Sequence, residues 1–219
     1  MKPLGFVTGM AVEAACIDAA SKSLGQPSHI HVTGGVAGSA AEGARRHVAA
    51  GVRALVSFGV AGGLDPALAP GDLIVGTFVW REDGAPIDTA ALTSELPIVA
   101  GGIAGVDKPV ASVARKSALH AESGAVAVDM ESHAVAAVAV EAGLPVLVLR
   151  AIVDPAARTI PSAALAGLGP DGRRRPFAVL ARLLANPTQI SALVQLAGDS
   201  RAALRSLARA MPAILNSRL

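Results

Sequence analysis

Short apolar runs alternate with longer alanine-rich segments as far as Val153, and few folds accommodate such an alternation. Apolar runs of strand length include Leu4–Thr8, Ala54–Val60 and Val146–Val153, and none of them shows the polar alternation of a half-exposed strand. Unbroken apolar strands separated by helices are typical of sheets that helices cover on both faces. The pattern therefore predicts an α/β protein with a central sheet flanked by helices.

Glycine and proline mark the ends of the expected helices and strands. Ala11–Leu24 is expected to form a helix that ends at Gly25, and Ser132–Ala142 one that ends at Gly143. Two further helices are expected at Ser39–Ala50 and Val110–Glu122, and three further strands at His29–Thr33, Leu73–Arg81 and Ala125–Val128.

Composition excludes several classes of protein. Apolar residues make up 52% of the 219 residues and the net charge is only +2, so the chain is not disordered. A single cysteine, Cys16, excludes a disulfide-stapled scaffold, and a content of 2% aromatic residues disfavours a base-stacking nucleic-acid module. There is no run of ~20 apolar residues and no signal-peptide core. We therefore expect a single cytoplasmic domain over residues 1–219, with no nucleic-acid partner.

Three carboxylates follow predicted strands: Glu13, Glu131 and Asp154. In α/β sheets the ligand binds at the carboxyl ends of the strands. Breaking a glycosidic bond needs an acid for the leaving group, a base for the nucleophile and negative charge near the cationic sugar. The alternative is that Glu13 and Glu131 are ordinary acids at helix N-termini. Asp129 is expected to point away from Glu131, because side chains alternate along an extended chain.

Two glycine-rich segments, residues 33–38 and 59–63, could be tight turns or could let a ligand approach the backbone. Neither has the G-x-G-x-x-G spacing of a dinucleotide site, so an oxidoreductase is disfavoured. The five histidines are scattered and Cys16 stands alone, so we expect neither a metal site nor a cofactor.

Several short segments resemble the purine/uridine phosphorylase superfamily, on the branch that contains 5′-methylthioadenosine/S-adenosylhomocysteine nucleosidase. They are Thr8–Glu13, Gly59–Leu64 with Pro70–Val75, and Val128–Ser132 with Arg150–Asp154. Their order and spacing match over residues 4–155. The run over residues 128–161 and the arginine-rich tail are similar to the hopanoid-associated phosphorylase subfamily, to which removal of adenine from adenosylhopane in hopanoid lipid biosynthesis is ascribed.

The resemblance implies a three-layer nucleoside phosphorylase-like fold with a central mixed sheet, and cleavage of the N-glycosidic bond of an adenosine-containing substrate. Asp154 matches the general acid that protonates N7 of the purine, and Glu13 matches the residue that activates water. The matching substrate contacts are Met130 and Glu131 for the ribose, Ala61, Gly62 and Val128 for the base, and Arg150 near the nucleophile. The relatives also lead us to expect a homo-oligomer, with a dimer favoured.

Two departures concern the nucleophile. Ser57 stands where hexameric phosphorylases have a phosphate-binding Arg, and Val60 stands where they have a Ser. These changes, together with Glu13, favour water as the nucleophile. Phosphate remains the alternative, held by glycine-rich backbone amides and by Arg45, Arg46 or Arg150.

A third departure concerns the base. Relatives often supply a stacking aromatic in the segment that corresponds to Gly105–Pro109, and none is present here. Aliphatic contacts are therefore expected, with Phe58 as a distant candidate for stacking. Alternative functions are a methylthioadenosine/S-adenosylhomocysteine nucleosidase, a purine nucleoside phosphorylase and, from another class, a non-catalytic nucleoside-binding protein.

The tail has a different charge from the rest of the chain. Residues 173–219 contain eight Arg and one Asp, whereas residues 1–172 contain 11 basic and 16 acidic residues. Arg201, Arg205 and Arg209 recur every four residues, opposite an apolar face expected at Leu204, Leu207, Ala208 and Met211. This helix either packs on the core with solvated arginines or also contacts an anionic membrane surface that carries a lipid-linked substrate.

Overall fold

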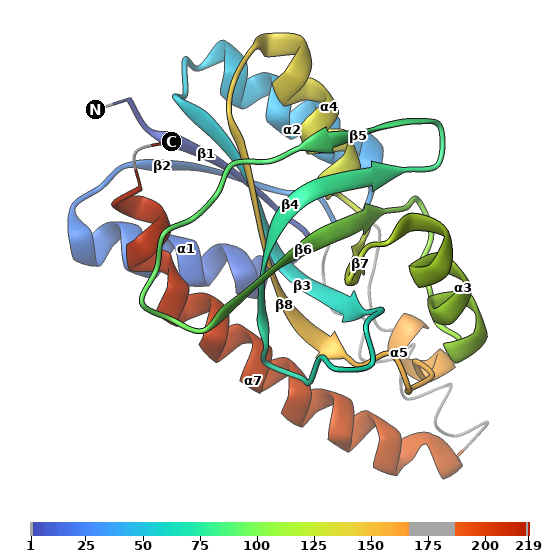
Figure 1. The fold of residues 1–219 in the computed structure, drawn as a ribbon. Coiled ribbons are helices and arrows are strands. Elements are labelled where there is room, and N and C mark those ends of the chain that lie inside the picture. The colour runs from blue at the N-terminus through green and yellow to red at the C-terminus, as the bar shows by residue number, and fades with distance from the viewer. Residues whose placement is uncertain (1, 167–186, 218) are drawn as a thin grey trace.

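A mixed sheet forms the centre of the molecule (Figure 1). The structure is a computed structural model, and it describes residues 2–166, 187–217 and 219. The strands are β1 (Leu4–Thr8), β2 (Ser28–Val32), β3 (Ala54–Gly63), β4 (Leu73–Arg81), β5 (Gly84–Asp88), β6 (Ile98–Gly105), β7 (Ala127–Asp129) and β8 (Val146–Asp154). Their order is β2-β1-β3-β7-β6-β4-β5, and β8 pairs with both β3 and β4.

The strand directions bring several strand ends together. β1 runs parallel to β2 and β3, and β3 runs parallel to β8. The carboxyl ends of β1, β3 and β8 therefore lie at one edge of the sheet. β7 pairs with β3 in the antiparallel direction, with Val128 opposite Gly62. The segment that follows Asp129 thus starts beside the end of β3.

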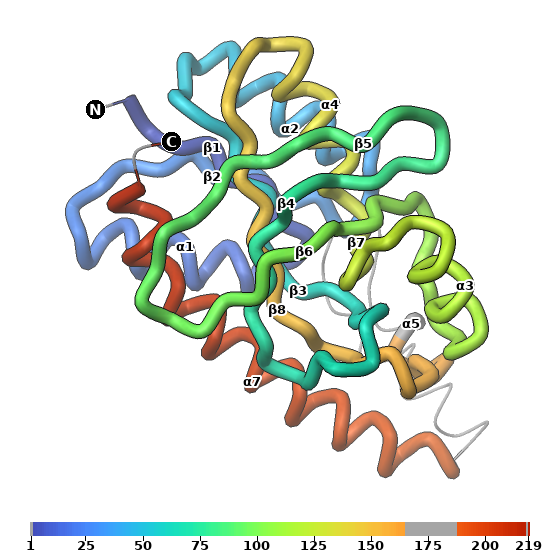
Figure 2. The backbone as a smooth tube through the Cα atoms, in the orientation of Figure 1, coloured from blue at the N-terminus to red at the C-terminus, as the bar shows by residue number. Residues whose placement is uncertain are grey.

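Helices cover both faces of the sheet, as Figures 1 and 2 show. They are α1 (Ala11–Leu24), α2 (Ala37–Ala49), α3 (Val113–Ser123), α4 (Ser132–Ala142), α5 (Ser162–Ala166), the 3-10 turn η1 (Pro187–Gln189) and α7 (Ile190–Leu215). α2 packs with α4 on one face, where Ala40, Ala44 and Val135 join the buried core. α1 packs with α7 on the other, where Ile17 and Leu207 meet buried residues of β1 and β3. The predicted α/β architecture is confirmed.

All of the predicted helices and strands are present, and those at Leu4–Thr8, Ala11–Leu24, Leu73–Arg81 and Ser132–Ala142 have the predicted ends. The other predicted elements differ by a few residues at their ends. β5 and β6 were not predicted. β5 is an exposed edge strand that contains Pro86, which is tolerated only where no ladder hydrogen bond is needed.

β6 was missed because Gly101 and Gly102 interrupt its apolar pattern. In the structure both glycines make room for neighbours instead of forming a turn. A Cβ at Gly101 would lie 2.5 Å from a methyl carbon of Val126, and one at Gly102 would lie 2.1 Å from the ring of Phe78. Close packing, which is invisible in a local pattern, keeps these residues in a strand.

The described part of the tail forms α7, whereas residues 173–186 of the predicted basic segment lie outside the described residues. Leu207 and Met211 are buried and Arg201, Arg205 and Arg209 are exposed, as predicted. The prediction for Ala208 was wrong, because it is exposed and Ala210 takes the buried position. Leu204 is half-buried. None of the helices that the structure describes is long and apolar enough to cross a membrane.

Candidate active site

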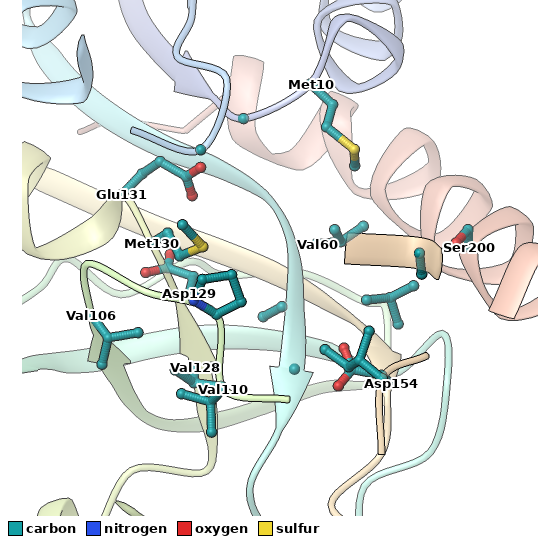
Figure 3. A pocket seen from close by; sticks show the side chains of 18 of the residues that line it. Met10, Val60, Val106, Val110, Val128, Asp129, Met130, Glu131, Asp154 and Ser200 are labelled. Carbon is teal, nitrogen blue, oxygen red and sulfur yellow. The ribbon is translucent and has the colours of Figure 1, made fainter. Parts of the chain in front are cut away.

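A cavity of about 420 Å³ lies at the edge of the sheet where β1, β3 and β8 end (Figure 3). Its size is typical of a small-molecule site. Seven of the eight residues to which the resemblance assigns a role line it, Arg150 being the exception: Glu13, Ala61, Gly62, Val128, Met130, Glu131 and Asp154. Asp129, Met130 and Glu131 cluster on one side of the cavity and Asp154 lies on the other side. The predicted residues therefore share one site.

Glu13 is buried at the start of α1, with a side chain held at both oxygens. Oε2 accepts hydrogen bonds from the Thr8 hydroxyl at 2.6 Å and the Met10 backbone N–H at 2.8 Å, while Oε1 accepts one from the Val60 N–H at 2.8 Å. Burial raises the pKa of Glu13, and these hydrogen bonds oppose that shift. The hydrogen bond from Met10 shows that Glu13 also caps the N-terminus of α1, which was the alternative interpretation of this residue. Glu13 lines the cavity at the same time.

Arg150 lies behind the cavity and is almost fully buried. Its guanidinium forms an ion pair with Asp129 and lies 3.6 Å from a carboxylate oxygen of Glu131. It also donates hydrogen bonds to the hydroxyls of Ser57, at 2.6 Å, and Ser132, at 3.0 Å. Nη1 is buried and finds no hydrogen-bond partner among the residues that the structure describes. The two N–H donors of Nη1 are thus left without an acceptor among the described residues.

Glu131 stands at the N-terminus of α4 and is buried. Burial raises its pKa to about 7, although the Arg150 guanidinium acts in the opposite direction, and the negative charges of Asp129 and Glu13 add to the rise. The Thr33 hydroxyl donates a hydrogen bond to Oε1 at 3.4 Å. Near neutral pH this carboxyl group can therefore donate or accept a hydrogen bond.

The orientation predicted for Asp129 was wrong. Asp129 lines the same cavity as Glu131, and both side chains reach Arg150. The strict alternation of an extended chain does not apply, because β7 ends at Asp129 and Glu131 has a ψ of −32°, outside the extended region. Asp129 also accepts hydrogen bonds from the backbone N–H and hydroxyl of Ser132.

Asp154, at the end of β8, is buried and faces the cavity. Its carboxylate is paired with Lys116 of α3, whose side chain is completely buried. Burial raises the pKa of Asp154, whereas the ammonium group of Lys116 and the more distant Arg158 lower it. Sequence reasoning missed Lys116. The available signal was its position three residues before the buried Leu119, on the inner face of a predicted helix.

Glycines allow the backbone to approach the carboxylates. A Cβ at Gly9 would lie 2.8 Å from Oε1 of Glu131, and one at Gly59 would lie 2.7 Å from Oε1 of Glu13. Gly34 and Gly35, with φ of 72° and 74°, form a turn that lines the cavity. Both predicted glycine segments therefore contribute to the site, and Gly34 and Gly35 also form the tight turn that was the alternative.

Part of the cavity lining is aliphatic. The aliphatic residues are Val106 and Pro109, from the segment that lacks the expected aromatic, together with Val110, Ile160 and Leu196. Phe58 was wrong as a candidate for stacking, because it lies in the core and packs edge-on against Phe6 at 6.3 Å between ring centroids.

The alternative phosphate ligands Arg45 and Arg46 are exposed on α2 and do not line the cavity. Arg46 instead pairs with Glu42 on the same helix. In the part of the chain that the structure describes, no group of three or more His, Cys, Asp or Glu side chains is arranged to hold a metal ion.

Comparison with known proteins extends this picture. Residues 22–89 and 85–185 match the family described as the phosphorylase superfamily. A comparison with curated proteins found no match.

Three solved structures illustrate the likeness in fold. A 5′-methylthioadenosine/S-adenosylhomocysteine nucleosidase from Neisseria meningitidis, in complex with methylthio-immucillin-A, has a TM-score of 0.74 at 16% identity, with 100% of both chains covered. Native futalosine hydrolase of Helicobacter pylori has a TM-score of 0.71 at 19% identity, covering 98% of this chain and 97% of its own.

A putative 5′-methylthioadenosine/S-adenosylhomocysteine nucleosidase from Francisella philomiragia has a TM-score of 0.70 at 20% identity, with 100% of both chains covered. At these identities the likeness concerns the fold. The family match spans most of the chain, and it agrees with a cavity at the expected edge of the sheet. This chain therefore belongs to the phosphorylase superfamily.

Proposed function

We propose that this protein hydrolyses the N-glycosidic bond of an adenosine-containing substrate and releases adenine. The observation that carries the proposal is the presence of three buried carboxyl groups, on Glu13, Glu131 and Asp154, in one cavity. Asp154 lies across the cavity from Glu131. This separation suits a substrate whose base and sugar need different partners.

The leaving base would bind near Asp154, between Ala61, Gly62 and Val128. A carboxyl group buried at a strand end retains its proton more readily than an exposed one, so it can act as a general acid. The Asp154 proton would go to N7 of the purine while the C1′–N bond breaks and its electrons move to the base. Glu131 and Met130 would hold the sugar, with the Glu131 carboxyl group on its hydroxyls.

Water would attack C1′ under the control of Glu13. The raised pKa of Glu13 makes its carboxylate a stronger base than an exposed glutamate, and its three hydrogen bonds fix its direction. The water oxygen would bond to C1′ and its proton would pass to Glu13. Arg150 does not line the cavity, and its guanidinium, 3.6 Å from a carboxylate oxygen of Glu131, would act on this step through the charge it offsets.

Phosphate is less well accommodated than water. A phosphate dianion would meet Asp129, Glu131 and Glu13, and the single guanidinium of Arg150 is already paired with Asp129. Ser57, which stands in place of a phosphate-binding Arg, accepts a hydrogen bond from Arg150. Val60 offers the cavity a backbone N–H that Glu13 already occupies.

The substrate that we propose is adenosylhopane, by resemblance to the hopanoid-associated subfamily. The many apolar residues in the lining of the cavity, among them Ile160 and Leu196, support a substrate with an apolar substituent. The Neisseria meningitidis neighbour is a methylthioadenosine/S-adenosylhomocysteine nucleosidase, and that activity is the alternative. The homodimer expected from the resemblance stays a prediction.

Adenine release from adenosylhopane, methylthioadenosine and adenosine, each with and without phosphate, tests the proposal. We expect the fastest release from adenosylhopane, at a rate that phosphate does not change and with the free sugar as co-product. A requirement for phosphate, with a sugar 1-phosphate as product, would show phosphorolysis. No release from any of the three substrates would favour a non-catalytic nucleoside-binding protein.

We also propose that the exposed basic face of α7 contacts an anionic membrane surface, which would bring the enzyme to a lipid-linked substrate. Arg201, Arg205 and Arg209 are exposed, and Leu196 and Ser200 of the same helix line the cavity. Each Arg near an anionic surface contributes about 1 kcal/mol to binding.

Co-sedimentation with liposomes tests this contact. We expect binding that requires anionic lipid and weakens with salt, and that an Arg201/Arg205/Arg209→Glu variant loses. Adenine release from water-soluble adenosine should be the same in both proteins. Equal sedimentation of the variant and the unchanged protein would rule out this surface.

A further inference from the structure

Lys116 is a fully buried lysine whose partners all lie at the end of β8. Its ammonium group donates hydrogen bonds to the Asp154 carboxylate and to the carbonyl oxygens of Asp154, Pro155 and Arg158, at 3.5, 2.9 and 3.0 Å. A buried charge is costly unless it is paired and hydrogen-bonded, and here four acceptors share it. Lys116 does not line the cavity, so it can influence a ligand only through Asp154.

The contact orients the carboxylate. Among the described residues, one hydrogen bond reaches the Asp154 side chain, and it runs from Lys116 to Oδ2. Oδ1 is left for a ligand in the cavity that Asp154 lines. The carbonyl contacts fix the turn after β8, and the Arg158–Asp199 ion pair ties the same turn to α7. The orientation of the Asp154 side chain therefore depends on contacts from α3, through Lys116, and from α7, through Asp199.

We propose that Lys116 is a positioning residue for departure of the base: it turns Oδ1 of Asp154 toward the cavity and offsets the charge of that carboxylate. This inference rests on the proposed function, in which Asp154 serves the leaving base. The charged groups around Asp154 are Lys116 from α3 and Arg158 from the turn, and Arg158 is itself paired with Asp199 of α7.

The positive charge of Lys116 lowers the pKa of Asp154. Burial raises the pKa of Asp154, and the ammonium group is the largest opposing cause. Without that positive charge the carboxyl group holds its proton to higher pH. Activity that needs protonated Asp154 then persists further into the alkaline range.

The pH dependence of kcat/KM for adenine release tests the proposal in Lys116→Gln, which keeps a donor without the charge, and in Lys116→Arg, which keeps the charge. In Lys116→Gln we expect the pH at which kcat/KM falls on the alkaline side, the alkaline limb of the profile, to rise by roughly one pH unit or more. This is the usual effect of removing an opposite charge within hydrogen-bond distance of a carboxyl group. We expect kcat to fall by roughly tenfold to a hundredfold, because the acid is less well aligned, with KM little changed. In Lys116→Arg the limb should stay in place.

A purely structural role would lower activity at every pH and leave the limb where it is, and that result in folded Lys116→Gln would overturn the proposal. A second measurement does not depend on turnover: the ¹³C NMR titration of the Asp154 carboxyl group, assigned with Asp154→Asn. If no substrate is cleaved, the proposed function fails while this titration still tests the coupling. An Asp154 titration that is the same in Lys116→Gln and the unchanged protein would overturn the inference.

Discussion

Replacing Asp154 by Asn is expected to slow adenine release by about 100- to 10,000-fold, the usual contribution of general acid catalysis. Asparagine has nearly the same shape as aspartate, but its amide cannot supply the proton that the leaving base needs. The loss should appear in kcat and in kcat/KM alike, because the proton is transferred in the transition state. Steady-state assays of adenine release across pH measure both constants.

The fold should survive this substitution. The Asn oxygen can still accept the hydrogen bond from Lys116, whose carbonyl contacts remain. Because neutral Asn removes the counter-charge of this buried ammonium group, we expect a lower unfolding temperature. Thermal unfolding followed by circular dichroism checks this point. Asp18→Asn is the matched control, since Asp18 is exposed on α1 and pairs with the exposed Lys22, so the activity of this variant should stay near normal. Full activity of Asp154→Asn would remove Asp154 from the mechanism.

Much of the site could be predicted from the sequence because the ends of parallel strands meet in space. Glu13 and Asp154 follow β1 and β8, and both strands run parallel to β3. Recognising buried strands was therefore enough to bring distant carboxylates to one edge of the sheet. The aliphatic contacts of Val106 and Pro109 followed from the absence of an aromatic in that segment.

The parts that could not be predicted depend on contacts between elements. Lys116 can be buried because the Asp154 carboxylate and the backbone carbonyls after β8 accept hydrogen bonds from its ammonium group. These acceptors are distant in the sequence, so the local pattern around Lys116 does not predict them. Asp129 faces the cavity because the chain leaves the strand conformation one residue later. Gly102 stays in a strand because the Phe78 ring needs its space. In each case tertiary packing overrides a local rule.

Arg150 shows how far the site depends on a single buried charge. It is 1% exposed, and it joins Asp129 and Glu131 to the hydroxyls of Ser57 and Ser132. Two buried carboxylates thus rely on one guanidinium for compensation. Removal of one partner of a buried ion pair leaves the other charge without compensation, and this typically costs about 3–5 kcal/mol of stability.

We therefore expect Arg150→Met to lower the free energy of unfolding by about 3–5 kcal/mol, measured by urea denaturation. Arg46→Met is the matched control, because Arg46 forms an exposed pair with Glu42 and its loss should cost less than about 1 kcal/mol. Adding Asp129→Asn to Arg150→Met should restore part of the stability, since the uncompensated carboxylate is then gone. Similar small losses in the two single variants would mean that Arg150 carries no special share of the stability. If Arg150→Met loses adenine release while Asp129→Asn alone retains it, the guanidinium is required at the site for more than holding Asp129 in place.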